Sequence, residues 1–364
     1  MGLIGNIASS PYMVIWYVVW FMASIFRPAI LATIVCMATN PKAAQEKIRL
    51  FVLTFQFWAL SKDKKFKKPT EDPASFFIEG EDEDKIERKT VIVLRHGEST
   101  WNDTFNKGDR KMGTFLIGFI PGLLRSLGAE WYFLLAGKSD ESWFYDSPLS
   151  KKGISQAEGV AKFLRETKTE FSTPKEAKLI KLLKGESDEK LQLASSNLRR
   201  AISTAAIALQ DLLDKNRDQK ISILTELQEA SVNPDAQSIH PPKAALVTSW
   251  IDSDRVREVY ATQCDTSLNM GNKSIKSNGL IRMEAFCDMV FDKMDAPNVM
   301  ATGHSYWFRA FFQTYLPRDF EHISKKKKLV NGGVAGFTLL RKKTDSGYKY
   351  MIDKNSVVTL YGGF

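Results

Sequence analysis

Histidine and arginine side chains follow strand-like apolar runs at two places in the sequence. Arg95 and His96 come directly after Val91–Leu94, and His304 comes shortly after Val299–Thr302. Only 4 histidines occur among the 364 residues, so two of them in such positions are a specific signal. Guanidinium groups bind anions through paired hydrogen bonds, and a neutral imidazole can act as a nucleophile. The sequence therefore predicts an anion-binding site that contains a reactive histidine.

Further charged residues follow two other strand-like segments. Arg200 lies shortly after residues 191–195, and Glu229 lies shortly after residues 221–224. The carboxyl ends of parallel strands meet at one edge of a sheet, where open α/β folds bind their ligands. A phosphoryl group in its transition state carries charge on three oxygens and needs several converging donors. The expected chemistry is therefore phosphoryl transfer, and the sequence shows no metal-ligand cluster that would assist it.

In type and order these motifs resemble the histidine phosphatase superfamily, in its phosphoglycerate-mutase-like branch. The motifs are Arg95-His96-Gly97, the Ser-x-Leu-x-Arg-Ala of residues 196–201, a glutamate, and a second histidine after a strand. The resemblance covers about residues 90–340. It implies a three-layer α/β fold, with a mostly parallel sheet flanked by helices, and a reaction that needs no metal and no cofactor.

The resemblance also implies a role for each site residue. His96 is the expected nucleophile, and Glu229 is the expected proton donor. The residues expected to bind the phosphate are Arg95, Asn102, Arg200 and His304. Glu226 is an alternative carboxylate, although the Leu-x-Glu spacing favours Glu229. Arg199 is expected to be a solvent-exposed neighbour of the phosphate-binding arginine.

Two departures from the family pattern bear on the reaction. Glu229 is followed by Ala-Ser-Val-Asn where mutases carry an aromatic-glycine element, so phosphatase activity is expected in preference to mutase activity. His304 is followed by Ser305 and Tyr306 where many members carry glycine. The second departure changes the expected shape of the leaving-group pocket and leaves the chemistry unchanged.

An apolar N-terminal region precedes the catalytic motifs. Residues 12–38 contain Arg27 as their single charged residue, and Pro28 follows it. As one helix they would be about 40 Å long, more than the roughly 30 Å hydrocarbon core of a bilayer. A tilted span and two half-length segments that dip in and return both accommodate the central arginine and proline. The alternatives are a buried core helix and a cleavable signal peptide.

A second apolar stretch and a charged segment follow. Residues 48–60 are too short to span a membrane alone but could lie in its interface. The lysines within 62–68 would attract anionic lipids and favour the cytosolic side of the membrane. The expected organisation is a membrane-associating helical region at 1–60, a charged linker at 61–89 and a catalytic domain at 90–364.

An apolar insertion, at about residues 106–143, interrupts the catalytic domain. Its core, residues 113–137, carries only Arg125 and Glu130 as charged residues. A solvent-exposed loop would be more polar, so two hypotheses stay open. The insertion is either a second membrane contact beside the active site or a lid or helical hairpin that packs on the domain.

The overall charge and the cysteines exclude other classes of protein. The net charge is +9, but much of the excess lies in the lysines of 62–68, so nucleic acid is not an expected partner. The 3 cysteines are far apart and form no Cys-x-x-Cys pair, which argues against a disulfide framework and a zinc site. A reducing compartment is expected.

The combined prediction is a membrane-associated phosphomonoesterase that acts through a phosphohistidine, with its catalytic domain in the cytosol. The expected partners are a phosphorylated small molecule or lipid and a membrane surface. Two alternatives remain: a catalytically silent phosphate-binding scaffold at a membrane, and a mutase-type phosphotransferase.

Overall fold

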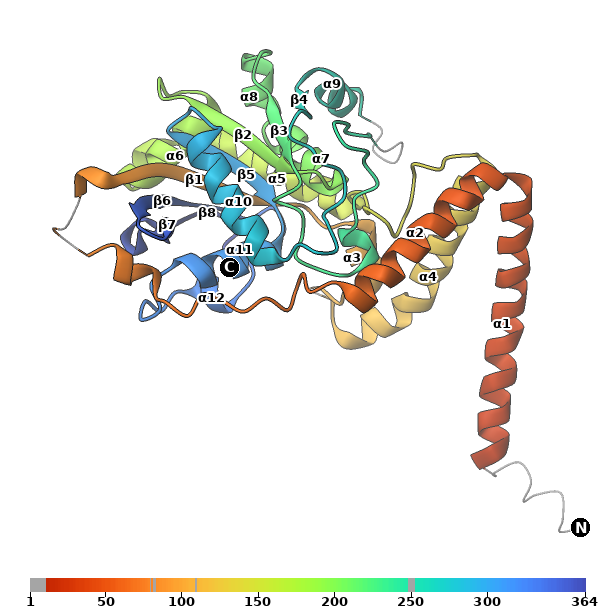
Figure 1. Cartoon of the computed structure of the whole chain (residues 1–364). Coiled ribbons are helices and arrows are strands. Elements are labelled where there is room, and N and C mark those ends of the chain that lie inside the picture. The colour runs from red at the N-terminus through yellow and green to blue at the C-terminus, as the bar shows by residue number, and fades with distance from the viewer. Residues whose placement is uncertain (1–10, 79, 81–82, 109, 248–252) are drawn as a thin grey trace, which may run out of the picture.

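The larger part of the chain is built on one mixed sheet. The computed structural model describes residues 11–78, 80, 83–108, 110–247 and 253–364. Within them, an eight-stranded sheet has the order β4-β3-β2-β5-β1-β6-β7, with β8 paired to β6 (Figure 1). Strands β1 to β5 are parallel, β6 is antiparallel to β1, and β7 and β8 are antiparallel to β6. The strands are β1 (Ile86–Arg95), β2 (Leu191–Ser196), β3 (Ile221–Leu224), β4 (Cys264–Asp265), β5 (Asn298–Gly303), β6 (Val334–Thr344), β7 (Gly347–Ile352) and β8 (Val358–Tyr361).

Helices cover both faces of this sheet. Side chains of β1 alternate between two cores: Ile92 and Leu94 belong to the core with α5 and α7, and Val91 and Val93 to the core with α10 and α11. A strand that is buried on both faces is apolar throughout, which is why the run was visible in the sequence. The predicted α/β fold, with a mostly parallel sheet between helices, is confirmed. The helices are α1 (Pro11–Thr39), α2 (Pro41–Leu60), α3 (Thr100–Phe105), α4 (Met112–Leu135), α5 (Lys151–Glu166), α6 (Pro174–Lys184), α7 (Arg199–Ala208), α8 (Gln210–Lys215), α9 (Asp254–Thr262), α10 (Gly279–Asp292), α11 (Ser305–Tyr315) and α12 (Ile323–Lys326).

Strand register sets the level of the predicted catalytic residues. Strands β1 and β5 are adjacent and parallel, with Arg95 opposite Gly303. The residue that follows each of these is a histidine, so both histidines leave the sheet at the same level. A side chain on Gly97 would collide with the backbone of Gly153, which explains the glycine after His96.

The environment of the Arg199 side chain differs from the predicted one. Its side chain is fully buried and forms an ion pair of 3.1 Å with Glu141. Its Nε donates to the backbone carbonyl of Asp146, and its backbone N–H donates to the Asp146 carboxylate. The prediction of a solvent-exposed neighbour was wrong, because this guanidinium holds the loop before α5 against the start of α7.

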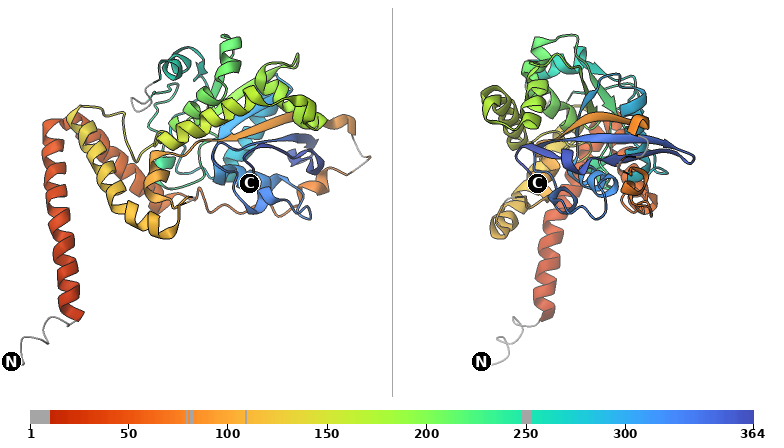
Figure 2. Two further views of the ribbon diagram at one scale, coloured as in Figure 1. Left: turned by 180° about the vertical axis from the view of Figure 1, so that it is seen from behind. Right: turned by 90° about the vertical axis from the view of Figure 1, so that its left-hand side faces the viewer.

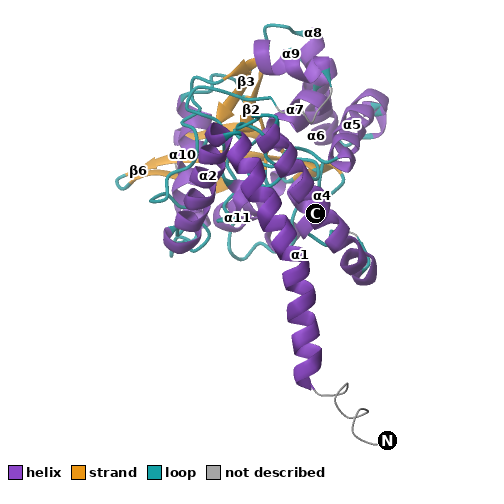
Figure 3. Cartoon of the chain, turned by 90° about the vertical axis from the view of Figure 1, so that its right-hand side faces the viewer, coloured by secondary structure: helices purple, strands orange, loops and turns teal. Residues whose placement is uncertain are grey.

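The N-terminal region forms long helices. Helix α1 is continuous through Pro28, so the arrangement of two half-length segments is not the one seen. Figure 2 shows that α1 extends away from the sheet domain in two further views. Helices α2 and α4 lie beside one another between α1 and the sheet (Figures 1 and 3). The apolar insertion is thus largely one helix, α4.

Few side chains of this helical region are buried. A small cluster joins α1, α2 and α4 through Cys36, Ala43, Ala44 and Leu134. Lys47 of α2 forms an ion pair of 2.8 Å with Glu130 of α4. Among the described helices, α4 is long and apolar enough to cross a membrane by length and composition, and only 6% of its most apolar window is buried.

Parts of the segment predicted as a charged linker, 61–89, lie on the sheet domain. Asp63 is 1% exposed, and Phe66 packs against the core that includes α10 and α11. The short helix Pro73–Phe76 contacts β7, and Lys349 of β7 lies over the ring of Phe76. Strand β1 itself already begins at Ile86.

Candidate active site

The two predicted catalytic histidines lie side by side at the carboxyl ends of β1 and β5. The backbone N–H of His96 donates to the carbonyl of Gly303 at 3.0 Å. The imidazole rings of His96 and His304 have centroids 4.9 Å apart. Their exposed fractions are 3% and 0%, so both rings are withdrawn from solvent. The strand register therefore brings together two residues that are 208 positions apart in the sequence.

Hydrogen bonds define the tautomer of His96. Its Nδ1 lies 2.5 Å from the carbonyl oxygen of Gly97. A carbonyl can only accept, so Nδ1 carries the proton and Nε2 keeps its lone pair. The Nε of Arg200 donates to this Nε2 at 3.2 Å. The unprotonated nitrogen of His96 thus accepts a hydrogen bond from the guanidinium group that would also attract a phosphate.

Arg200 is held in the first turn of α7. Its Nη1 donates to the backbone carbonyl of Asp235 at 2.6 Å, and its Nη2 lies 3.5 Å from the Asp235 carboxylate. Burial raises the pKa of Asp235, and the guanidinium of Arg200 opposes this. Asp235 was not predicted, because it lies in a loop-rich region with no recognisable motif.

His304 is anchored through one ring nitrogen. Its Nε2 lies 2.9 Å from the hydroxyl of Ser196, the residue that ends β2. Its Nδ1 is buried and has no hydrogen-bond partner among the described residues. A buried polar atom without a partner is costly, so the Nδ1 of His304 is an unsatisfied group next to His96.

Glu229 is fixed at the start of α11. Its carboxylate accepts the backbone N–H groups of Ala230 and Trp307, each at 3.0 Å. Carboxylates at a helix N-terminus satisfy unpaired N–H groups and the helix dipole. Its side chain lines the same cavity as His96.

The alternative carboxylate, Glu226, has a different environment. It does not line that cavity in the described structure, and burial raises its pKa. Its backbone carbonyl accepts the indole N–H of Trp307 at 3.0 Å. Of the two carboxylates, only Glu229 is placed to reach a group bound beside His96.

Arg95 and Asn102 approach the cavity from the segment around β1. The Nη1 of Arg95 donates to the carbonyl of Leu329 at 2.7 Å. Asn102 lies in the first turn of α3, which is capped by Ser99 and begins four residues after His96. Its side-chain carbonyl accepts from Asn106 at 2.8 Å. Both predicted phosphate-binding residues line the cavity.

The cavity has a volume of about 170 Å³ and unites most of the predicted site. The predicted residues that line it are Arg95, His96, Asn102, Arg200 and Glu229. His304 lies behind His96 and is fully buried. Ser305 and Tyr306, which the sequence analysis expected to shape the leaving-group pocket, also line it. The lining residues without a predicted role in the site are Lys64, Trp101, Asn106, Ala230, Ser231, Asn233, Asp235 and Lys328.

The electrostatic environment keeps the imidazoles neutral. Burial lowers the pKa of His96 well below its usual value, and the positive charges of Arg200 and Arg95 lower it further. Burial and then Arg200 also lower the pKa of His304. Both rings are therefore neutral at pH 7, so His96 can act as a nucleophile without first losing a proton.

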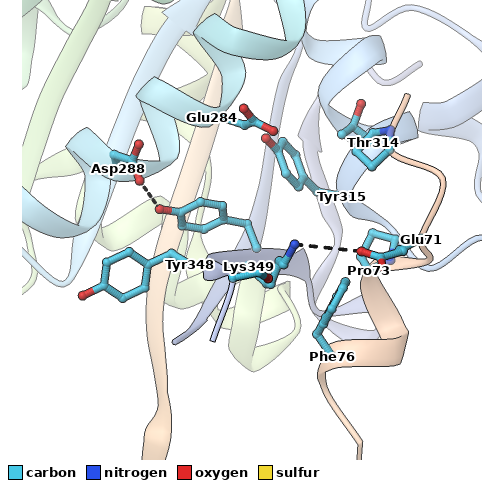
Figure 4. A pocket seen from close by; sticks show the side chains of 12 residues that line it. Glu71, Pro73, Phe76, Glu284, Asp288, Thr314, Tyr315, Tyr348 and Lys349 are labelled. Carbon is cyan, nitrogen blue, oxygen red and sulfur yellow. Dashed lines mark hydrogen bonds and ion pairs between the residues drawn. The ribbon is translucent and has the colours of Figure 1, made fainter. Parts of the chain in front are cut away.

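A second, larger cavity lies elsewhere and has a different chemical character. It has a volume of about 400 Å³ and lies between residues 69–76, helices α10 and α11, and strand β7 (Figure 4). Glu71, Glu284 and Asp288 line it together with several aromatic rings. Its described lining contains three carboxylates and one cationic side chain, Lys349, so its charge disfavours a phosphate. The smaller cavity at His96 is the candidate active site.

Comparisons with known proteins found similar chains among solved structures. No protein-family model matches the chain, and no curated protein sequence matches it. The chain is similar to a mycobacterial glucosyl-3-phosphoglycerate phosphatase at 16% identity, covering 73% of this chain and 97% of that chain, with a TM-score of 0.34.

Two further solved structures show a comparable likeness. A phosphoserine phosphatase from Entamoeba histolytica has 15% identity, covers 72% of this chain and 94% of its own, and gives a TM-score of 0.30. A phosphoglycerate mutase from Bacillus anthracis has 15% identity, covers 74% of this chain and 93% of its own, and gives a TM-score of 0.34.

Proposed function

We propose that this protein is a phosphomonoesterase of the histidine phosphatase type that forms a phosphohistidine on His96. The observation that carries the proposal is the pair of neutral histidines with centroids 4.9 Å apart, beside two arginines and a carboxylate that line one cavity. A scaffold that only bound phosphate would need the arginines but neither the oriented imidazole nor the carboxylate.

In the first step, the Nε2 of His96 attacks phosphorus. The P–N bond forms as the ester P–O bond breaks, and Glu229 donates a proton to the leaving oxygen. Arg95, Arg200 and Asn102, which line the cavity, bind the phosphoryl oxygens, and the ring of His304 packs against that of the nucleophile. These groups stabilise the charge that develops in the transition state.

In the second step, water hydrolyses the phosphohistidine. The Glu229 carboxylate, which has just given up its proton, takes one from the attacking water. The P–N bond breaks as the new P–O bond forms, and inorganic phosphate leaves. The site returns to its starting protonation state, so the cycle needs no metal and no cofactor.

Phosphate release and phosphoenzyme trapping test the function directly. The full chain is incubated with a panel of ³²P-labelled phosphomonoesters, quenched and denatured. The expected result is release of phosphate together with a protein-bound label that is lost in acid. Absence of both on every ester of the panel would instead favour a phosphate-binding scaffold.

Paired variants test the assignment of the proton donor. Glu229→Gln is expected to lower kcat by about 10²- to 10⁴-fold, because an amide cannot donate the proton. Glu226→Gln is the matched control, since its side chain lies outside the cavity, and its kcat is expected to stay near the wild-type value. Steady-state kinetics on one ester measures both. A larger loss in the Glu226 variant would reverse the assignment.

We also propose that the protein is membrane-associated, with the catalytic domain facing the cytosol. Large apolar side chains are exposed on all three helices of the N-terminal region and insertion, among them Leu31 of α1, Phe51 of α2 and Ile117 of α4. In water, such surface has an unfavourable free energy that a bilayer removes. The lysines that follow α2 favour an anionic, cytosolic leaflet.

Vesicle sedimentation tests the membrane proposal. The wild-type chain is expected to sediment with phosphatidylcholine–phosphatidylserine vesicles, and the double variant F51E/I117E is expected to remain largely in the supernatant. The control, M270E/I281E, changes two exposed apolar residues away from these helices. Equal sedimentation of both double variants would contradict the assignment of this surface.

A further inference from the structure

The segment directly after α2 is held on the catalytic domain by a buried ion cluster. The Asp63 carboxylate lies 2.8 Å from the Nζ of Lys273 and 2.5 Å from the Nη1 of Arg282. The backbone carbonyl of Asp63 also accepts the N–H of Gly279 at 3.1 Å. The position of the next residue, Lys64, is therefore fixed relative to the sheet domain.

Lys273 joins this cluster to the catalytic loop. Its Nζ donates to the backbone carbonyls of Glu229 at 2.5 Å and Ser231 at 2.6 Å. One ammonium thus contacts both Asp63 and the loop that carries the proposed proton donor. The N-terminal segment and the active site share a single hydrogen-bond network.

Two lysines line the cavity in addition to the residues proposed to bind the phosphate. Lys64 and Lys328 both line it. The Nζ of Lys64 lies 5.1 Å from the ring centroid of Tyr306, and the guanidinium of Arg309 lies 5.3 Å from the same centroid. Burial lowers the pKa of Lys328, with nearby Glu229 acting in the opposite direction. These groups form a cationic rim on one side of the cavity.

The lysines of this rim add to the positive charge of the cavity. Arg95 and Arg200 line the cavity, where the carboxylates of Asp235 and Glu229 offset part of their charge. The ion pairs within 4.0 Å at this site, among the described residues, join Arg200 to Asp235 and Lys273 and Arg282 to Asp63, and include neither Lys64 nor Lys328. Like charges at close range are unfavourable unless an anion joins them. The rim therefore has the charge to bind a second anionic group.

We propose that Lys64 and Lys328 bind a second anionic group of the substrate, a carboxylate or another phosphate, next to the phosphate that is hydrolysed. Asp63 acts as a positioning residue, because it holds the segment that supplies Lys64. The proposal rests on the proposed phosphatase function and names the substrate class for that site.

Two matched pairs of soluble esters test the second subsite. 3-Phosphoglycerate and glycerol 3-phosphate differ only in a carboxylate against a hydroxymethyl group. Glucose 1,6-bisphosphate and glucose 6-phosphate differ in a second phosphate. The wild-type chain is expected to have a kcat/KM about tenfold higher for the doubly anionic member of at least one pair, chiefly through KM. The pair that shows the preference identifies the second anion.

Lysine variants test which residues cause the preference for the doubly anionic ester. K64M and K328M are each expected to lower kcat/KM about tenfold more for the doubly anionic ester than for its partner. If both lysines bind the same anion, the double variant loses less of the preference, expressed as a free energy, than the sum of the losses in the two single variants. The control is K65M, whose lysine lies in the same basic run but does not line the cavity; its preference should equal that of the wild type.

The proposal would be overturned if the wild-type chain treated both members of each pair alike, or if K65M lost the preference as K64M does. Failure of the phosphatase function is distinguishable, because it would abolish turnover of every ester. In that case, calorimetric titration of the full chain with the same four compounds still tests the subsite. Tighter binding of the doubly anionic members, lost in K64M, supports it, and equal binding refutes it.

Discussion

Replacing His96 with asparagine is expected to lower kcat by on the order of 10⁴-fold or more on any ester that the wild-type chain hydrolyses. Asparagine keeps a polar side chain of similar reach but has no nitrogen lone pair that can attack phosphorus. The acid-labile label of the phosphoenzyme should disappear with the activity. Because the arginines and Glu229 remain in place, the variant should still bind inorganic phosphate.

His322→Asn is the matched control for this result. His322 lies at the start of α12 and does not line the cavity, and its Nδ1 contacts Ser324. Its kcat and its label are expected to stay near those of the wild type. A His96→Asn protein that still formed the phosphoenzyme would show that another residue is the nucleophile. His304→Asn, assayed in parallel, would identify the nearest candidate.

The carboxyl ends of the strands were the predictable part of this site. Strands buried on both faces are apolar throughout, so β1 and β5 could be recognised from their composition alone. The strand fixes the position of the residue that directly follows it, as β1 does for His96. The sequence therefore predicted the residues at the base of the cavity, together with the α/β fold that carries them.

The rim of the cavity could not be predicted in the same way. Lys64 lies in a basic run whose composition is typical of a solvated or membrane-facing segment. Its place depends on Asp63, one acidic residue within that run, which pairs with Lys273 and Arg282 more than 200 positions away. Asp235 likewise reaches Arg200 from a loop without periodicity. Such contacts follow from tertiary packing, which leaves no local pattern in the sequence.

Replacing Asp63 with asparagine is expected to destabilise the catalytic domain by roughly 3–5 kcal/mol. The side chains of Asp63 and Lys273 are 1% and 0% exposed, so solvent cannot replace the lost charge. The pKa of Lys273 is already lowered to about 8 by burial, against the opposing effect of Asp63. Without that carboxylate, Lys273 gives up its proton more easily, whereas Arg282 stays charged and buried without a counterion.

Thermal unfolding of the full chain measures this loss. In a domain of this size, each kcal/mol lowers Tm by about 2–4 °C, so a decrease of roughly 6 °C or more is expected. Glu71→Gln is the control, since its carboxylate is 65% exposed and its 3.9 Å ion pair with Lys349 contributes little. An Asp63→Asn protein with unchanged Tm would show that the N-terminal segment is not fixed by this cluster. In that case the backbone hydrogen bond from Gly279 to Asp63 and the packing of Phe66 on the core would be the contacts that hold Lys64 at the cavity.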